Sequence, residues 1–119
     1  MFNITKNNKL INKKIAIEHM VLAYIICKDN KEAERISMLL LKKRLIACAN
    51  IFPVKSLYWW KGKILKHAES VLIAKSSRKK YKKLEREVKK IHSYEVPCIL
   101  NINAIPNIEY GRWAQKELR

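Results

Sequence analysis

The segment from Ala47 to Ser76 constrains the fold of this chain most, because it predicts one long β-hairpin. Its first half, ACANIFPVKSLYWW (47–60), has the β-branched and aromatic content of an extended strand. The turn is predicted at Lys61-Gly62, because glycine readily adopts the positive φ that a tight hairpin turn needs. The return strand over Lys63–Lys75 ends in the apolar segment VLIA (71–74), which predicts a central position in a sheet.

Apolar runs and helix-capping residues predict the elements on either side of this hairpin. They are a strand at Val21–Cys27, a helix capped by Asp29, a helix capped by Ser76 or Ser77, a strand at Cys98–Ile105 and a short helix after Asn107. Pro53 within the hairpin indicates a bulge or an unpaired edge position. The order βαββαβ with a final helix predicts an α+β, ferredoxin-like fold, in which the first two helices cover one face of an antiparallel sheet.

The length of 119 residues fits a single domain, which we place at residues 20–119, with residues 1–19 as a disordered or extended polar lead. No apolar run approaches the roughly 18 residues that a membrane helix needs, and we expect no membrane partner. The cysteines Cys27, Cys48 and Cys98 form no CxxC pair, and their odd number fits reduced thiols. We therefore expect a cytoplasmic protein.

The net charge of +16 raises the hypothesis of nucleic-acid binding. Lysine, isoleucine and asparagine are all abundant, however, and this combination is typical of AT-rich codons. RNA-recognition modules share the predicted fold, but they carry aromatic residues on the third strand, where this chain has KILKHAESVLIAK (63–75). We interpret the charge as a solvated lysine-rich surface and expect no specific nucleic-acid partner, with electrostatic binding to nucleic acid as an alternative.

Three consecutive aromatic residues, Tyr58, Trp59 and Trp60, stand directly before the predicted turn. Successive residues of a strand point to opposite faces, so a single subunit cannot bury all three side chains. Trp and Tyr are also enriched at the energetic centres of protein interfaces. We therefore predict that the hairpin tip contacts another subunit, and packing of the tip on its own subunit is the alternative.

No catalytic motif is present, and the histidines fall in different predicted elements, so we expect no enzymatic activity. Cys27 at the end of the first strand and His92 at the end of the second helix offer a thiolate and an imidazole, which suit copper or zinc. We expect these two residues towards opposite ends of the sheet, unless the helix is short or a second subunit intervenes. Cys48 and Cys98 fall within predicted strands and are expected in the core.

Several segments resemble the CutA divalent-cation tolerance family and follow the family's order. They are LIACANIFPVKSLYWWKGKI (45–64), Glu69, LIAKSS (72–77), IHSYEVP (91–97) and the pair Tyr110 and Trp113. The resemblance covers about residues 20–119, and the block that contains YWW is highly specific. It implies a ferredoxin-like subunit that assembles as a homotrimer through its second and third strands. The residues expected at the trimer interface are Tyr58, Trp59, Trp60 and Glu69.

The resemblance also implies a role in tolerance of divalent cations, copper (Cu2+) above all. The family's proposed copper ligands correspond to Cys27 and His92 of this sequence. The family pattern differs at Ile91, Ser93 and Cys98, so the third ligand stays open, with the Cys98 thiolate as one chemical candidate. Because the trimer of this family resembles PII-type signalling proteins, the alternative function is a PII-like sensor of a small anionic ligand.

Overall fold

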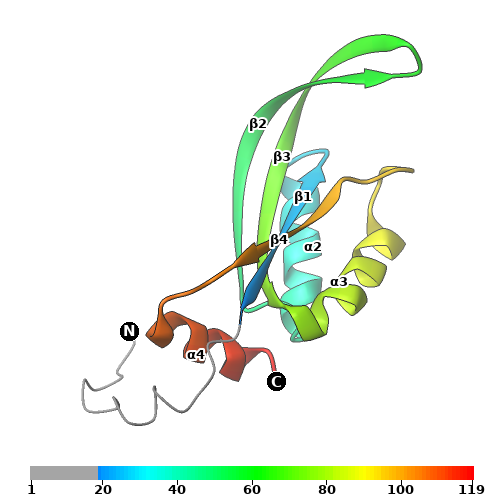
Figure 1. The fold of residues 1–119 in the computed structure, drawn as a ribbon. Helices are drawn as coiled ribbons and strands as arrows, with labels where there is room; N and C mark the ends of the chain where they lie inside the picture. The colour runs from blue at the N-terminus through cyan, green and yellow to red at the C-terminus, as the bar shows by residue number, and fades with distance from the viewer. Residues whose placement is uncertain (1–18) are drawn as a thin grey trace.

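The computed structural model describes residues 19–119, which form a four-stranded antiparallel sheet with three helices (Figure 1). The elements are β1 (Met20–Cys27), α2 (Asn30–Lys42), β2 (Cys48–Trp60), β3 (Lys63–Ser77), α3 (Arg78–Ile91), β4 (Ile99–Ala104) and α4 (Ile108–Glu117). The strand order β2-β3-β1-β4 confirms the predicted ferredoxin-like fold with its extra C-terminal helix. The lead predicted over residues 1–19 lies outside the described residues, except for His19.

Strands β2 and β3 form the predicted hairpin, which projects well beyond the helices in Figure 1. Lys61 (φ 48°) and Gly62 (φ 78°) both have positive φ, as the two-residue turns that match strand twist require. The pairing of β2 with β3 is continuous past Pro53, so the proline makes no bulge. It is tolerated because β2 is an edge strand of the sheet.

The core lies between the sheet and helices α2 and α3, which cover the same face (Figure 1). On β1, alternate side chains point to this face, and Ala23, Ile25 and Cys27 are fully buried there. Leu84 and Val88, four residues apart on α3, are also fully buried. The alternation of buried and less buried side chains on β1 and the helical spacing of apolar residues on α3 therefore determine which face of each element packs inward.

Neither α2 nor α3 covers the opposite face of the sheet, and this face remains apolar. Leu100 and Ile102 of β4 and Phe52 of β2 are 49%, 43% and 41% exposed. Helix α4 lies at one end of the sheet, where the Lys75 ammonium is 5.0 Å from the centre of the Tyr110 ring. Exposed apolar surface of this extent is typical of a protein interaction site.

Glu87 of α3 links the two core helices. Its carboxylate forms ion pairs with Lys43, which directly follows α2, and with Lys90 on its own helix (2.9 Å). Hydrogen bonds from these two lysines lower the pKa of Glu87 from 4.5 to about 2. Because the folded-state pKa lies below that of the unfolded chain, this stabilisation is complete above pH 4.5 and is lost as the pH falls towards 2.

We therefore expect Glu87→Gln to reduce stability at neutral pH and to approach the wild type as the pH falls from 4.5 to 2. The measurement is the urea midpoint of both proteins across this range. Glu34→Gln, an exposed position on α2, serves as the control and should follow the wild type at every pH. A Glu87→Gln deficit that stays constant down to low pH would contradict the role of the ion pairs.

Candidate metal centre

The end of β1 and the end of α3 bring Cys27 and His92 together. Strand β3 runs antiparallel to β1 with Met20 opposite Ser77, so α3, which begins at Arg78, starts beside the beginning of β1. The helix then runs back along the sheet and ends at His92, beside the end of β1. The expectation that Cys27 and His92 lie towards opposite ends is therefore wrong, because it missed this reversal of direction between β3 and α3.

Cys27, Glu32 and His92 form a compact group of metal-ligating side chains. The thiol, carboxylate and ring donor atoms all lie within 4.8 Å of one another. Cys27 is fully buried, Glu32 is 2% exposed and His92 is half-buried. Within residues 19–119 this is the one group of three such side chains that can hold a metal ion. Sulfur, nitrogen and oxygen donors in this combination suit copper or zinc.

Glu32 reaches this group through the cap of α2. The Asp29 side chain accepts a hydrogen bond from Glu32 N (2.8 Å), which confirms the predicted N-cap. The Glu32 carboxylate turns back to accept from Lys28 N (2.9 Å), and it also accepts from Ser93 N (2.9 Å) directly after His92. The sequence predicts the cap but does not reveal Glu32 as a member of the cluster, since Ser93 lies 61 residues further along the chain.

Backbone groups hold the His92 ring on both sides. Its Nε2 donates to the carbonyl of Ile26 (2.7 Å), and its Nδ1 accepts from the backbone N–H of Tyr94 (3.0 Å). A backbone carbonyl on one ring nitrogen is the usual partner of a metal-binding histidine, because it fixes the tautomer and the ring orientation. In this tautomer the ring lone pair is on Nδ1, where it accepts the Tyr94 N–H hydrogen bond.

Burial and charge set the protonation of the cluster. Burial, followed by the negative charge of Glu32, raises the pKa of the Cys27 thiol to about 12. Burial also opposes ionisation of Glu32, but hydrogen bonds from Lys28 and Ser93 outweigh it and lower the pKa of this carboxyl. The cluster therefore holds a neutral thiol beside a carboxylate at neutral pH. A bound metal ion displaces a thiol proton, so such a site takes up the ion with release of a proton.

The hairpin tip distributes its aromatic residues over two faces, as the alternation of a strand predicts. Trp59 shares one face with Leu57 and with Ile64, its cross-strand partner, and these side chains are 71%, 64% and 64% exposed. Tyr58 and Trp60 point to the other face, where Trp60 is 41% exposed. Within the described chain, the tip therefore keeps a three-residue apolar surface (Leu57, Trp59 and Ile64), which we call the tip face.

The remaining predicted residues are not members of the metal cluster. Glu69 is 7% exposed and accepts a hydrogen bond from the Tyr94 hydroxyl (2.5 Å). Cys98 lies just before β4, and Cys48 opens the edge strand β2. Both cysteines are only half-buried, so the prediction that they belong to the core is wrong. Edge positions and strand ends escape full burial, which the apolar character of the two segments does not reveal.

The sheet order, the hairpin and the Cys-Glu-His cluster define a ferredoxin-like α+β protein with a candidate metal centre at one end of its sheet. Residues 21–117 match the family described as CutA1 divalent ion tolerance protein, and the chain belongs to this family. The resemblance inferred from the sequence is thereby confirmed. Residues 19–119 contain no helix that is long and apolar enough to cross a membrane.

Individual relatives agree with the family match. The divalent-cation tolerance protein CutA of Archaeoglobus fulgidus is 49% identical over 88 residues, which are 74% of this chain and 82% of that relative. The protein of the same name from Thermotoga maritima is 39% identical over 101 residues, covering 83% of this chain and 99% of its own. The solved structure of the periplasmic divalent cation tolerance protein CutA from Archaeoglobus fulgidus superposes with a TM-score of 0.82 and 40% identity, over 85% of this chain and 99% of that chain.

Proposed function

We propose that this protein binds copper as part of divalent-cation tolerance, with Cys27 and His92 as ligands and Glu32 as the third donor. The observation that carries the proposal is the placement of their three donor atoms within 4.8 Å of one another. A thiolate favours soft ions and an imidazole suits copper, while the carboxylate adds negative charge to offset that of the cation. In this proposal the protein binds the copper ion and does not catalyse a reaction. Retention of the ion lowers the concentration of free copper.

Each residue has a separate task in this proposal. Cys27 supplies a thiolate in a fully buried position, where water does not compete for the ion. The Ile26 carbonyl holds Nε2 of His92, so that Nδ1 binds the ion in exchange for the Tyr94 N–H. The carboxylate of Glu32 stays ionised because the N–H groups of Lys28 and Ser93 donate to it.

Titration with Cu2+ tests these assignments. We expect the wild type to bind about one ion per chain, and Cys27→Ala and His92→Ala each to weaken binding at least about tenfold, since even supporting residues of metal sites have effects of this size. The measurement is a competition titration against a chromophoric chelator. His67→Ala is the matched control, because His67 lies on the hairpin and contacts Tyr58 instead. Unchanged affinity in both cluster variants would exclude the proposed ligands.

We infer further that the protein assembles as a homotrimer through its hairpin. The exposed tip face and the apolar open face of the sheet support a contact between copies, because a monomer in water gains nothing from either surface. Tyr58, Trp59, Trp60 and Glu69 are the residues proposed at or near this contact.

The three cysteines are all unpaired, which supports a reducing, cytoplasmic location for the assembly.

A further inference from the structure

Every exposed residue of helix α3 is basic. The helix contains eight basic and two acidic residues among its 14, whereas α2, with 13 residues, contains three basic and two acidic residues. Seven residues of α3 are exposed, the first being Arg78 and the last Lys90, and all seven are lysine or arginine. A lysine-rich composition alone predicts a similar coating on both helices. The structure instead concentrates the positive charge on one of them.

Helical geometry gathers these seven side chains on one side of α3. Because successive residues are rotated by about 100°, the seven positions fall within an arc of about 140°. This arc lies opposite Leu84 and Val88, which are fully buried in the core. At about 1.5 Å per residue, the distance from Arg78 to Lys90 along the axis is about 18 Å. The helix therefore presents an entirely cationic surface to solvent.

The central part of this surface has no acidic partner. We call four of its residues the basic face: Lys79, Lys82, Lys83 and Arg86. Within residues 19–119, none of the four forms an ion pair. Their spacing of i, i+3, i+4 and i+7 places like charges on neighbouring turns, which destabilises a helix. The first turn also holds no acidic residue, although the helix dipole disfavours cations there. An anionic partner would remove this repulsion.

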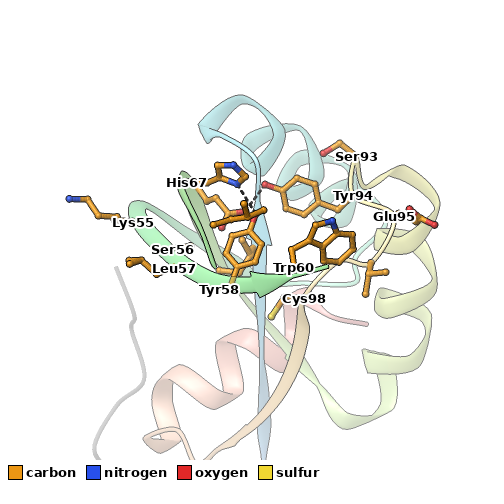
Figure 2. Close-up of a pocket in the computed structure, with 14 residues that line it drawn as sticks. Lys55, Ser56, Leu57, Tyr58, Trp60, His67, Ser93, Tyr94, Glu95 and Cys98 are labelled. Atoms are coloured by element: carbon orange, nitrogen blue, oxygen red, sulfur yellow. Dashed lines mark hydrogen bonds between the residues drawn. The ribbon is translucent and has the colours of Figure 1, made fainter. Parts of the chain in front are cut away.

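The basic face lies away from the surfaces proposed for the homotrimer contact. Helices α2 and α3 cover one face of the sheet, whereas the contact is proposed at the hairpin and on the opposite face (Figure 1). Figure 2 shows Tyr58, Trp60 and Tyr94 around a hollow beside the hairpin, which belongs to the proposed contact surface. The residues that line this hollow include none of α3. Assembly through the hairpin would therefore leave the basic face open to a partner.

The residue types on the exposed side of α3 indicate which polyanion fits it. Interfacial helices insert apolar side chains into a membrane, but the apolar residues of α3 already pack in the core. Proteins that bind single-stranded nucleic acid add aromatic rings for base stacking, and the seven exposed residues include no aromatic ring. A DNA duplex carries about ten phosphate charges over a length of about 18 Å. A rigid and purely cationic surface of this length therefore fits the regular backbone of a double helix.

We propose that the basic face of α3 binds double-stranded DNA through its phosphates, without reading the base sequence. The ammonium and guanidinium groups donate hydrogen bonds to phosphate oxygens, and the release of counterions from the DNA favours association. This binding agrees with the expectation of no specific nucleic-acid partner, but it gives the positive charge a role beyond solvation. It is independent of the proposed copper centre, because the basic face contains none of the metal-ligating residues.

Fluorescence anisotropy of short labelled DNA duplexes, titrated with the full chain, tests the proposal. We expect the logarithm of the binding constant to fall linearly with the logarithm of the salt concentration, with a slope of about −3 to −4 for about four phosphate contacts. Two duplexes of unrelated sequence should bind within about twofold of each other, because phosphate contacts carry no sequence information. No binding at about 0.1 M salt, or a slope near zero, would overturn the proposal without reliance on any variant.

Two double variants that remove the same charge locate the contact. Lys82→Gln/Arg86→Gln changes the basic face, so it should weaken duplex binding at least about tenfold and reduce the salt slope by about 2. Lys31→Gln/Lys116→Gln changes exposed positions of α2 and α4 and should bind within about twofold of the wild type. Equal losses in the two double variants would show that net charge alone is responsible and would overturn the proposal.

Two other polyanions are titrated at the same salt concentration to separate DNA from its competitors. They are the single strand of the same sequence and vesicles of phosphatidylcholine and phosphatidylserine. We expect the duplex to bind more tightly than the single strand, because its phosphates are more closely spaced. Tighter binding of the single strand would overturn the proposal. Binding to the vesicles that Lys82→Gln/Arg86→Gln abolishes, with no binding to the duplex, would overturn it in favour of a membrane surface.

Discussion

Trp59→Asp is expected to convert the proposed trimer into a monomer of 14.1 kDa. Trp59 is 71% exposed at the centre of the tip face, between Leu57 and Ile64. Large aromatic side chains of this kind contribute about 2 to 4 kcal/mol each at interfaces, and a carboxylate in their place is desolvated without a partner. The measurement is the molar mass by multi-angle light scattering at several protein concentrations.

Met38→Asp provides the matched control for this experiment. Met38 is also an exposed apolar residue (52%), but it lies on α2, on the helical side of the molecule. We expect Met38→Asp to retain the molar mass of the wild type, because its surface is outside the proposed contact. A Trp59→Asp protein that keeps the wild-type mass would contradict an interface at the tip face, and a monomeric wild type would contradict assembly altogether.

Glu32→Ala is expected to lower the free energy of unfolding by about 3 kcal/mol and to weaken copper binding as well. The carboxylate accepts hydrogen bonds from the backbone N–H groups of Lys28 and Ser93, and it is 2% exposed. Its removal leaves both N–H donors without their carboxylate acceptor at a partly buried position. The measurements are urea unfolding without metal and a chelator competition with Cu2+.

Two further variants separate the structural role of Glu32 from its role as a ligand. Glu34→Ala on the same helix is exposed and should change stability by less than about 0.5 kcal/mol. Glu32→Gln keeps one oxygen acceptor, so it should be more stable than Glu32→Ala and still bind copper more weakly than the wild type. Wild-type copper affinity in Glu32→Gln would remove Glu32 from the ligand set, while leaving Cys27 and His92 in place.

The hairpin and the element order are predictable because their signals are local. Lys61-Gly62 specifies the turn within two residues, and both take the positive φ that this turn needs. Asp29 caps α2, as the sequence predicts. The resemblance to the CutA family depends largely on this hairpin segment, so the family also followed from local sequence.

The candidate metal site was harder to predict because its members come from distant elements. The sequence predicts Cys27 and His92 as candidate ligands, but their proximity depends on α3 running back along the sheet after β3. Glu32 is near both because its carboxylate binds Ser93 N across the fold. The sequence leaves the Cys98 thiolate open as a third ligand, yet this residue is not a member of the Cys27, Glu32 and His92 cluster. Helical or strand periodicity carries no information about such contacts between elements.

The most direct test of the proposed copper centre is diffraction from a crystal of the full chain soaked in Cu2+, with data collected at the copper absorption edge. We expect an anomalous difference peak between the Cys27 sulfur, the His92 ring and the Glu32 carboxylate, with the Tyr94 N–H released from Nδ1 of His92. A peak at another position, such as His67 on the hairpin, with none at this cluster would contradict the proposed centre.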